Sequence, residues 1–259
     1  MNIRKKERVG EEKYNEQGYL MKIVDYINCH HISVKFTQPQ ESIVTSGYDK
    51  FETGKIKNPY APSVYGMGCA GVTYPTSENH KQLKEYKTWH GVLQRCFDEK
   101  YKQRQPTYKN VVVCEDWLNY EKFYEWIHSQ ENYEQWKNNN DWHIDKDILV
   151  KRNKVYAPDK CCLIPRDVNI LFTKRDNYRG DYPIGVSYNK SNDGYSAMCS
   201  TKNGRARLGI YSTPEEAFYV YKHFKENLIK KIAKETYTKG EITKRCYEAL
   251  MSYKVEITD

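Results

Sequence analysis

Alternating apolar and polar residues near the start of the chain predict strands with one buried face. Ile32, Val34 and Phe36 are separated by single polar residues, so they would share one side of a half-buried strand. Residues 21–27 form a second β-rich run, and the short polar stretch between the two runs favours a hairpin. Glycines, prolines and aromatic residues follow in a pattern typical of turns and short strands. We predict a small β-rich module, an SH3-like or other small barrel, over residues 1–76.

The spacing of apolar residues changes to a helical period after this module. Tyr86, Trp89, Leu93 and Cys96 stand three or four residues apart, which is the spacing of one helix face. This pattern predicts an amphipathic helix over residues 83–97.

A strand, a second helix and a hairpin complete a central module at residues 77–172. The apolar run at 111–114 predicts a short buried strand, and Asn119 or Asp116 can cap the helix that follows it. In the stretch 142–165, two segments in which apolar and polar residues alternate are separated by a turn, as expected of a β-hairpin.

Residues 173–181 are polar and basic, which predicts a linker, and residues 182–259 show three short strands and a long helix. Asn203-Gly204 is a signal for a tight hairpin. Thr213 and Glu216 are spaced as a capping box at the start of the helix. Its apolar stripe would cover one face of the sheet and leave the other face open.

The expected fold class is therefore α+β. It consists of a small N-terminal β-rich module, a central ββα module with flanking helices, and a C-terminal three-stranded sheet plus helix with a helical tail.

Composition and charge narrow the class of protein. A formal net charge of +8, from 42 Lys+Arg and 34 Asp+Glu, favours a polyanionic partner. No apolar run approaches the roughly 18 to 20 residues that a membrane crossing needs, so we expect no membrane partner and a cytoplasmic location. The eight cysteines include no Cys-x-x-Cys pair. Reduced thiols are expected, and a zinc site is not.

Three motifs of the central module stand in a recognisable order. They are Trp89 with Arg95-Cys96, then Cys114-x-x-Trp117, then the stretch 142–165 with its Tyr156-x-Pro158. This order resembles that of phage-encoded HNH proteins, the His-Me finger class related to homing endonucleases. The resemblance implies a ββα-metal hairpin and a nuclease that acts on DNA with Mg²⁺, or another divalent cation, if the site is active.

Residues 143–153 would carry the chemistry that this resemblance implies. In the family an imidazole removes a proton from the attacking water, and a metal stabilises the leaving oxygen. Asp145 falls at the metal-ligand position, and Asp147 alternates onto the same face. Lys146 falls at the position of the base, where an amine with a reference pKa of about 10.4 is a poor proton acceptor near neutral pH.

The catalytic motif is therefore degenerate, and two interpretations stay open. In the first, His143 serves as the base and Asn153 replaces the missing amide. In the second, the strand is a solvated edge whose Ile144 and Ile148 face the core. The candidate catalytic residues are His143, Asp145, Lys146 and Asn153, and the candidate metal ligands are Asp145 and Asp147.

The C-terminal module carries Gly185-Val186, Tyr195-Ser-Ala, Leu208-Gly-Ile-Tyr and Thr213-x-Glu-Glu-Ala in order. This order resembles the three-stranded, APETALA-like DNA-binding domain of plant ethylene-response factors, which phage HNH proteins often carry. The resemblance implies that the sheet lies in the major groove. The candidate DNA contacts are Tyr188, Lys190, Ser196, Met198, Arg205 and Arg207 on the open face, with Lys174, Arg175 and Arg179 in the linker.

The expected function is that of a phage-type DNA-binding protein of HNH homing-endonuclease descent in the bacterial host cell. It would nick or cut double-stranded DNA with a divalent metal if the degenerate motif is active. One alternative is a catalytically inactive DNA-binding regulator. Another is a phage protein-binding, anti-defence factor built on the same scaffold.

Overall fold

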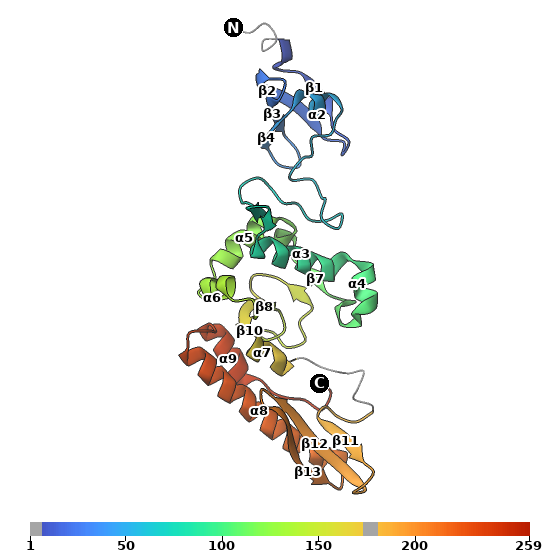
Figure 1. Cartoon of the computed structure of the whole chain (residues 1–259). Helices are drawn as coiled ribbons and strands as arrows, with labels where there is room; N and C mark the ends of the chain where they lie inside the picture. Colours follow the sequence, from blue (N-terminus) through green and yellow to red (C-terminus); the bar gives the residue numbers. More distant parts are fainter. Residues whose placement is uncertain (1–6, 173–180) are drawn as a thin grey trace. The chain divides into compact units, whose positions relative to one another are not determined.

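A computed structural model describes residues 7–172 and 181–259 of the chain (Figure 1). The chain divides into two compact units, Met1–His128 and Ser129–Asp259. Both contain helices and sheets, so the predicted α+β class is confirmed. Within the described ranges, no helix combines the length and apolar character needed to cross a bilayer. The module boundaries expected from the sequence stay predictions.

The first unit opens with a four-stranded antiparallel sheet and a short helix. Its elements are β1 (Glu12–Tyr14), β2 (Leu20–Asn28), β3 (His31–Phe36), β4 (Ser42–Ser46) and α2 (Tyr48–Glu52), with the strands in sequential order. Ile32, Val34 and Phe36 are almost completely buried on one face of β3. The alternation in the sequence therefore correctly predicts the buried face of this strand.

The rest of the first unit packs around aromatic side chains. Its elements are β5 (Ser77–Glu78), β6 (Lys81–Gln82), α3 (Lys84–Phe97), α4 (Glu99–Arg104), η1 (Pro106–Tyr108), β7 (Val112–Val113), η2 (Glu115–Leu118) and α5 (Tyr120–His128). Trp89 on α3 is fully buried, and its Nε1 donates to the carbonyl of Trp117 at 2.7 Å. The prediction of a buried strand is wrong for Val112, which is 51% exposed, because adjacent strand residues face opposite sides.

The second unit opens with a helix and a hairpin. The elements are α6 (Tyr133–Asn138), β8 (Trp142–Asp145), β9 (Val155–Tyr156), β10 (Cys162–Pro165), α7 (Arg166–Asn169) and η3 (Ile170–Phe172). β8 and β10 pair antiparallel, and α7 follows directly on β10. The buried Asn132 supports β10, because its Nδ2 donates to the carbonyl of Leu163 at 2.9 Å.

A three-stranded antiparallel sheet and two helices complete the second unit. They are β11 (Val186–Asn189), β12 (Gly194–Thr201), β13 (Gly204–Tyr211), α8 (Pro214–Thr238) and α9 (Lys244–Ser252). Thr201 pairs with Gly204, which confirms the tight hairpin predicted there. The capping box is also confirmed, because the Thr213 Oγ1 accepts from the Glu216 N–H and the Glu216 carboxylate accepts from the Thr213 N–H.

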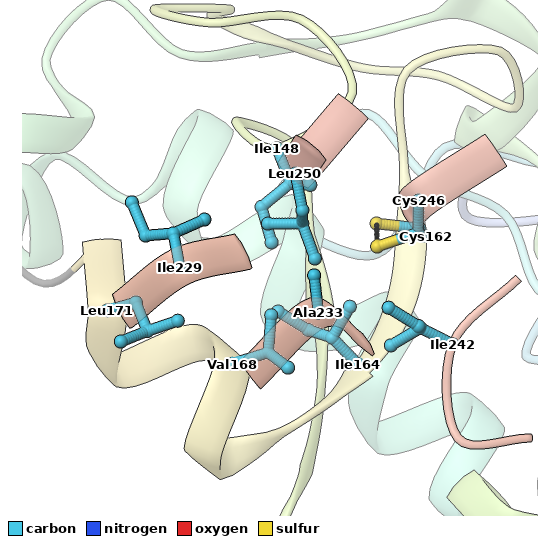
Figure 2. Close-up of a cluster of buried hydrophobic side chains, with 10 residues drawn as sticks. All are labelled: Ile148, Cys162, Ile164, Val168, Leu171, Ile229, Ala233, Ile242, Cys246 and Leu250. Carbon is cyan, nitrogen blue, oxygen red and sulfur yellow. Dashed lines mark hydrogen bonds between the residues drawn. The ribbon is translucent and has the colours of Figure 1, made fainter. Parts of the chain in front are cut away.

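The long helix α8 contributes to two hydrophobic cores of the second unit. The first core, against the three-stranded sheet, contains Val186, Ala197, Cys199, Ala217, Phe218, Tyr221 and Val255. The second core, around the hairpin and α9, contains Ile148, Cys162, Ile164, Val168, Leu171, Ile229, Ala233, Ile242, Cys246 and Leu250 (Figure 2). One helix of 25 residues therefore links the packing of the sheet to that of the hairpin.

Candidate nucleic-acid interface and HNH-like hairpin

One face of the β8–β10 hairpin carries both expected catalytic residues and core residues. Directly paired residues of antiparallel strands point to the same side, so His143 and Asp145 share a face with their partners Ile164 and Cys162. These two partners are buried in the core with α8 and α9 (Figure 2). His143 is exposed, whereas burial raises the pKa of Asp145. Asp145 therefore lies beside a packed apolar layer.

The carboxylate of Asp145 holds the backbone of its own turn. Its Oδ1 accepts hydrogen bonds from the N–H groups of Asp147 and Ile148, each at 2.8 Å. An aspartate that accepts from backbone groups two and three residues later stabilises a tight turn. The turn directs Ile148 into the core, where it is 3% exposed, as the edge-strand interpretation predicts, whereas Ile144 is half-buried and pairs with Leu163 on the other face of the hairpin.

Lys146, at the position expected for the base, is a nearly buried cation. It is 6% exposed, and its Nζ is 2.6 Å from Oδ2 of Asp147 and 5.9 Å from the centre of the Tyr156 ring. The attraction between an ammonium and a carboxylate strengthens away from bulk water. An ammonium held in this way has no lone pair with which to accept a proton.

Asn153 closes the loop between β8 and β9. The side chain is buried, and its Nδ2 donates to the carbonyls of Lys146 at 2.8 Å and Val155 at 2.7 Å. Its Oδ1 accepts from the N–H of Val155 at 3.0 Å. Both ends of the amide are engaged with the backbone. Asn153 therefore joins Asp145, Lys146 and Asp147 in one hydrogen-bonded turn as a structural residue.

Replacing Asn153 with alanine should destabilise the second unit by about 1–3 kcal/mol, because buried backbone groups lose their partners. The measurement is the free energy of unfolding from urea denaturation. Asn227→Ala is the control, since Asn227 lies exposed on α8 and should change stability by less than about 0.5 kcal/mol. An equal loss in the free energy of unfolding for the two variants would show that the Asn153 amide does not stabilise the loop.

Each aspartate of the hairpin already has one carboxylate oxygen engaged by another group. Asp145 is engaged by two backbone N–H groups, and Asp147 is engaged by the ammonium of Lys146. A divalent cation between them would be repelled by that ammonium. Among residues 7–172 and 181–259 there is no group of three or more His, Cys, Asp or Glu that could hold a metal ion. In this arrangement the residues do not fit the metal site implied by the HNH resemblance.

The three-stranded sheet turns one face of β12 toward α8 and the other face away from it. Ala197 and Cys199 are buried in the core with α8. Strand residues alternate between faces, so Ser196 and Met198 lie on the opposite, open face. This is the face on which the sequence places them.

Two arginines lie on the same open face. Arg207 pairs with Met198, and Arg205 pairs with Ser200, so all four side chains point away from α8. Both arginines and Ser200 are exposed. The open face therefore presents two guanidinium groups on alternate positions of β13 beside hydroxyl and thioether side chains.

A bulge in β13 adds a residue to the open face that simple alternation misses. The register shifts between Ala197 and Met198. Gly209 has φ 135°, and a Cβ there would lie 2.7 Å from the Tyr211 hydroxyl oxygen, so glycine permits this geometry. Beyond the bulge Ile210 pairs with Ser196 and is 45% exposed. The signal in the sequence is a glycine inside a strand.

Tyr188 does not share the open face, so that prediction is wrong. Tyr188 pairs with Tyr195, which packs on the side of α8. The buried residue of β11 is Val186, and alternation from Val186 sends Tyr188 to the same side. The Tyr188 hydroxyl donates to Oδ1 of Asp193 at 2.5 Å, and this hydrogen bond raises the pKa of Tyr188.

The other candidate DNA contacts lie outside the sheet. Lys190 is exposed in the turn between β11 and β12. The linker candidates Lys174, Arg175 and Arg179 lie outside the described residues.

Comparisons with known proteins found no relatives of this chain. No protein family matches it, no curated protein matches it, and no solved structure matches it.

Proposed function

We propose that the chain is a phage-type DNA-binding protein of HNH homing-endonuclease descent, acting in the cytoplasm of a bacterial host, whose C-terminal sheet binds double-stranded DNA. The observation that supports this proposal most is the placement of Arg205 and Arg207 together on the face of the sheet that α8 leaves open. Arginine combines a permanent charge with a planar set of donors that matches phosphate and guanine.

We propose that the open face of the sheet enters the major groove of DNA. A β-ribbon fits into that groove. The base edges there present a different pattern of donors and acceptors for each of the four base pairs. Serine hydroxyls can donate to or accept from a base or a phosphate, and an apolar side chain such as Ile210 can contact a thymine methyl group. Ser196 and Met198 on β12 and Ile210 on β13 supply these chemistries beside the arginines on the open face.

The charge of the sheet segment agrees with this partner. Residues 183–212 contain four basic residues and one acidic residue, namely Lys190, Lys202, Arg205, Arg207 and Asp193. Lys202 is paired with Asp167 of α7 at 2.7 Å, which leaves Lys190 and the two arginines as the candidate phosphate contacts of the sheet.

The HNH-like hairpin enters this proposal as a scaffold. Asp145 and Asn153 hold its turn, and Ile148, Cys162 and Ile164 supply core contacts for α8 and α9. We propose that a hairpin of nuclease descent now supports the DNA-binding sheet.

Titration of a duplex with the protein across a range of salt concentrations tests the proposal. A protein that neutralises phosphates releases counterions, so the logarithm of its affinity falls linearly with the logarithm of the salt concentration. Undetectable binding, or affinity that does not respond to salt, would instead favour the protein-binding alternative.

The HNH resemblance separately predicts cleavage of DNA with Mg²⁺, whereas the contacts within the hairpin predict that no cleavage occurs. Because Asp145 and Asp147 are engaged by other groups, we expect supercoiled plasmid to remain intact when incubated with the wild-type protein and Mg²⁺. The controls are His143→Ala and Asp145→Ala, analysed by gel electrophoresis. Nicking by the wild type that both variants lose would restore the nuclease assignment and make His143 the candidate base.

A further inference from the structure

Two adjacent cations of the loop that follows β8 are covered by the acidic end of the chain. Lys151 Nζ lies 2.9 Å from Oδ2 of Asp259 and 3.4 Å from Oε2 of Glu256, and it donates to the carbonyl of Lys254 at 2.7 Å. The Lys151 side chain is 25% exposed and that of Asp259 is 3% exposed. The ammonium is therefore surrounded by oxygen atoms of the tail.

Arg152 binds the same tail with its guanidinium group. Its Nη2 lies 3.0 Å from Oε2 of Glu256 and 3.4 Å from Oδ1 of Asp259, and it donates to Oγ1 of Thr258 at 2.8 Å. Arg152 has φ 62°, a backbone conformation that L-residues adopt rarely and that marks a locally constrained loop. The carboxylates of Glu256 and Asp259 therefore each form ion pairs with both cations.

The tail is anchored before these acidic residues. Val255 is buried in the core with the sheet, and its N–H donates to Oε1 of Glu226 at 2.9 Å. Residues 256–259 then form a turn in which the Glu256 N–H donates to Oδ2 of Asp259 and the Asp259 N–H donates to the Glu256 carbonyl. Glu256 and Asp259 therefore belong to one short segment that follows the anchored Val255.

We propose that Lys151 and Arg152 form a second phosphate-binding position of the protein, which Glu256 and Asp259 occupy until the phosphodiester backbone of DNA displaces them. This inference rests on the proposed DNA-binding function. The site already binds anionic oxygen atoms, and carboxylate and phosphate are recognised by the same Lys and Arg geometry.

The Arg152–Glu256 pair, with both side chains about half exposed, contributes little stability and is screened by salt, whereas the Lys151–Asp259 pair, 25% and 3% exposed, is the stronger contact that DNA must displace. DNA presents a continuous row of phosphates with a condensed counterion atmosphere, so its contact with two cations adds the favourable release of counterions. The acidic turn therefore lowers the affinity for DNA and excludes weaker anions.

The test uses the full chain with Glu256→Gln and Asp259→Asn, which keep the shape and one acceptor oxygen in each side chain but remove both charges. Because DNA displaces the tail in the wild-type protein too, the slope of log affinity against log salt should stay nearly the same in the tail variant, and it should become shallower by about 1.8, at about 0.9 per phosphate, when Lys151→Ala and Arg152→Ala are added. Affinity for a labelled duplex at low salt should rise at least about threefold. Circular dichroism and thermal melting check the fold, and a chain ending at Val255 is the second variant.

A matched control removes the same two charges elsewhere in the second unit. Glu235→Gln and Glu248→Gln release Lys231 and Lys244, which are already about three-quarters exposed in their ion pairs and hence already accessible to phosphate. Their double variant should leave the affinity at low salt nearly unchanged. Adding Lys151→Ala and Arg152→Ala to the neutralised tail should abolish the gain.

Equal affinities for the tail variant and the control variant, or a gain that survives loss of Lys151 and Arg152, would overturn the inference. Failure of the proposed function is a separate outcome. It is seen when the protein with its native tail binds DNA equally well with and without Arg205 and Arg207. A gain that depends on Lys151 in a protein insensitive to Arg205 would support the second site and reject the sheet.

Discussion

Replacing both Arg205 and Arg207 with alanine is expected to weaken the affinity for duplex DNA by about 2–6 kcal/mol, since a good arginine contact with a base contributes about 1–3 kcal/mol. A loss of this size corresponds to at least about a thirtyfold rise in Kd. Both side chains are exposed on the open face of the sheet, so their removal should change the free energy of unfolding by less than about 0.5 kcal/mol. The measurement is fluorescence anisotropy of a labelled duplex at fixed salt.

The matched control is Lys231→Ala with Lys234→Ala, which removes two charges from exposed positions of α8. Because α8 covers the other side of the sheet, the control should retain most of the affinity. Equal losses in the two double variants would show that binding depends on the total charge of the protein and that the sheet is not the interface.

Replacing Leu250 with alanine is expected to destabilise the second unit by about 2–5 kcal/mol, the usual cost of truncating a buried leucine. Leu250 is completely buried on α9 in the core that contains Ile229 and Ala233 of α8 (Figure 2). The loss combines the transfer free energy of the missing atoms with the cavity that remains.

The loss at Leu250 should also reach the sheet, because the same α8 packs on β12 through Ala217 and Tyr221. Hydrogen exchange followed by mass spectrometry should show weaker protection in α9, β10 and β12 together. The control is Ile257→Ala, since Ile257 is 46% exposed. Faster exchange confined to α9 would show that α8 does not couple the two cores.

Local sequence patterns correctly predict the elements whose signals are short-range. Thr213 and Glu216 stand three residues apart, and their capping box forms as expected. Alternation around Ala197 correctly places Ser196 and Met198 on the open face. In these cases the physical cause lies within a few residues of the pattern.

The residues of the sheet that the sequence misplaces or does not identify depend on the register of the strands. Tyr188 lies on the side of α8 because Val186 is the buried residue of β11. Ile210 reaches the open face because a bulge at Gly209 inserts one residue into β13. A single inserted residue exchanges the faces of every side chain beyond it, and the sequence alone marks this only by a glycine.

The candidate catalytic residues show a second limit of sequence reasoning. A motif identifies residue types, but the role of each depends on its hydrogen-bond partners. Lys146 and Asp147 pair with each other, and Asn153 binds the backbone of the loop. Lys151 and Arg152 carry no motif, and their contact with Asp259 joins residues more than a hundred positions apart.

The most direct test of the central claim is the salt dependence of duplex binding, measured for the wild-type protein and for the variant with Arg205→Ala and Arg207→Ala. With Lys190 and the two arginines on phosphates, log affinity should fall with log salt with a slope of about −2.7 or steeper. The double variant should be shallower by about 1.8 if both arginines contact phosphates. A slope near zero, or identical slopes and affinities for the two proteins, would contradict DNA binding by the open face of the sheet.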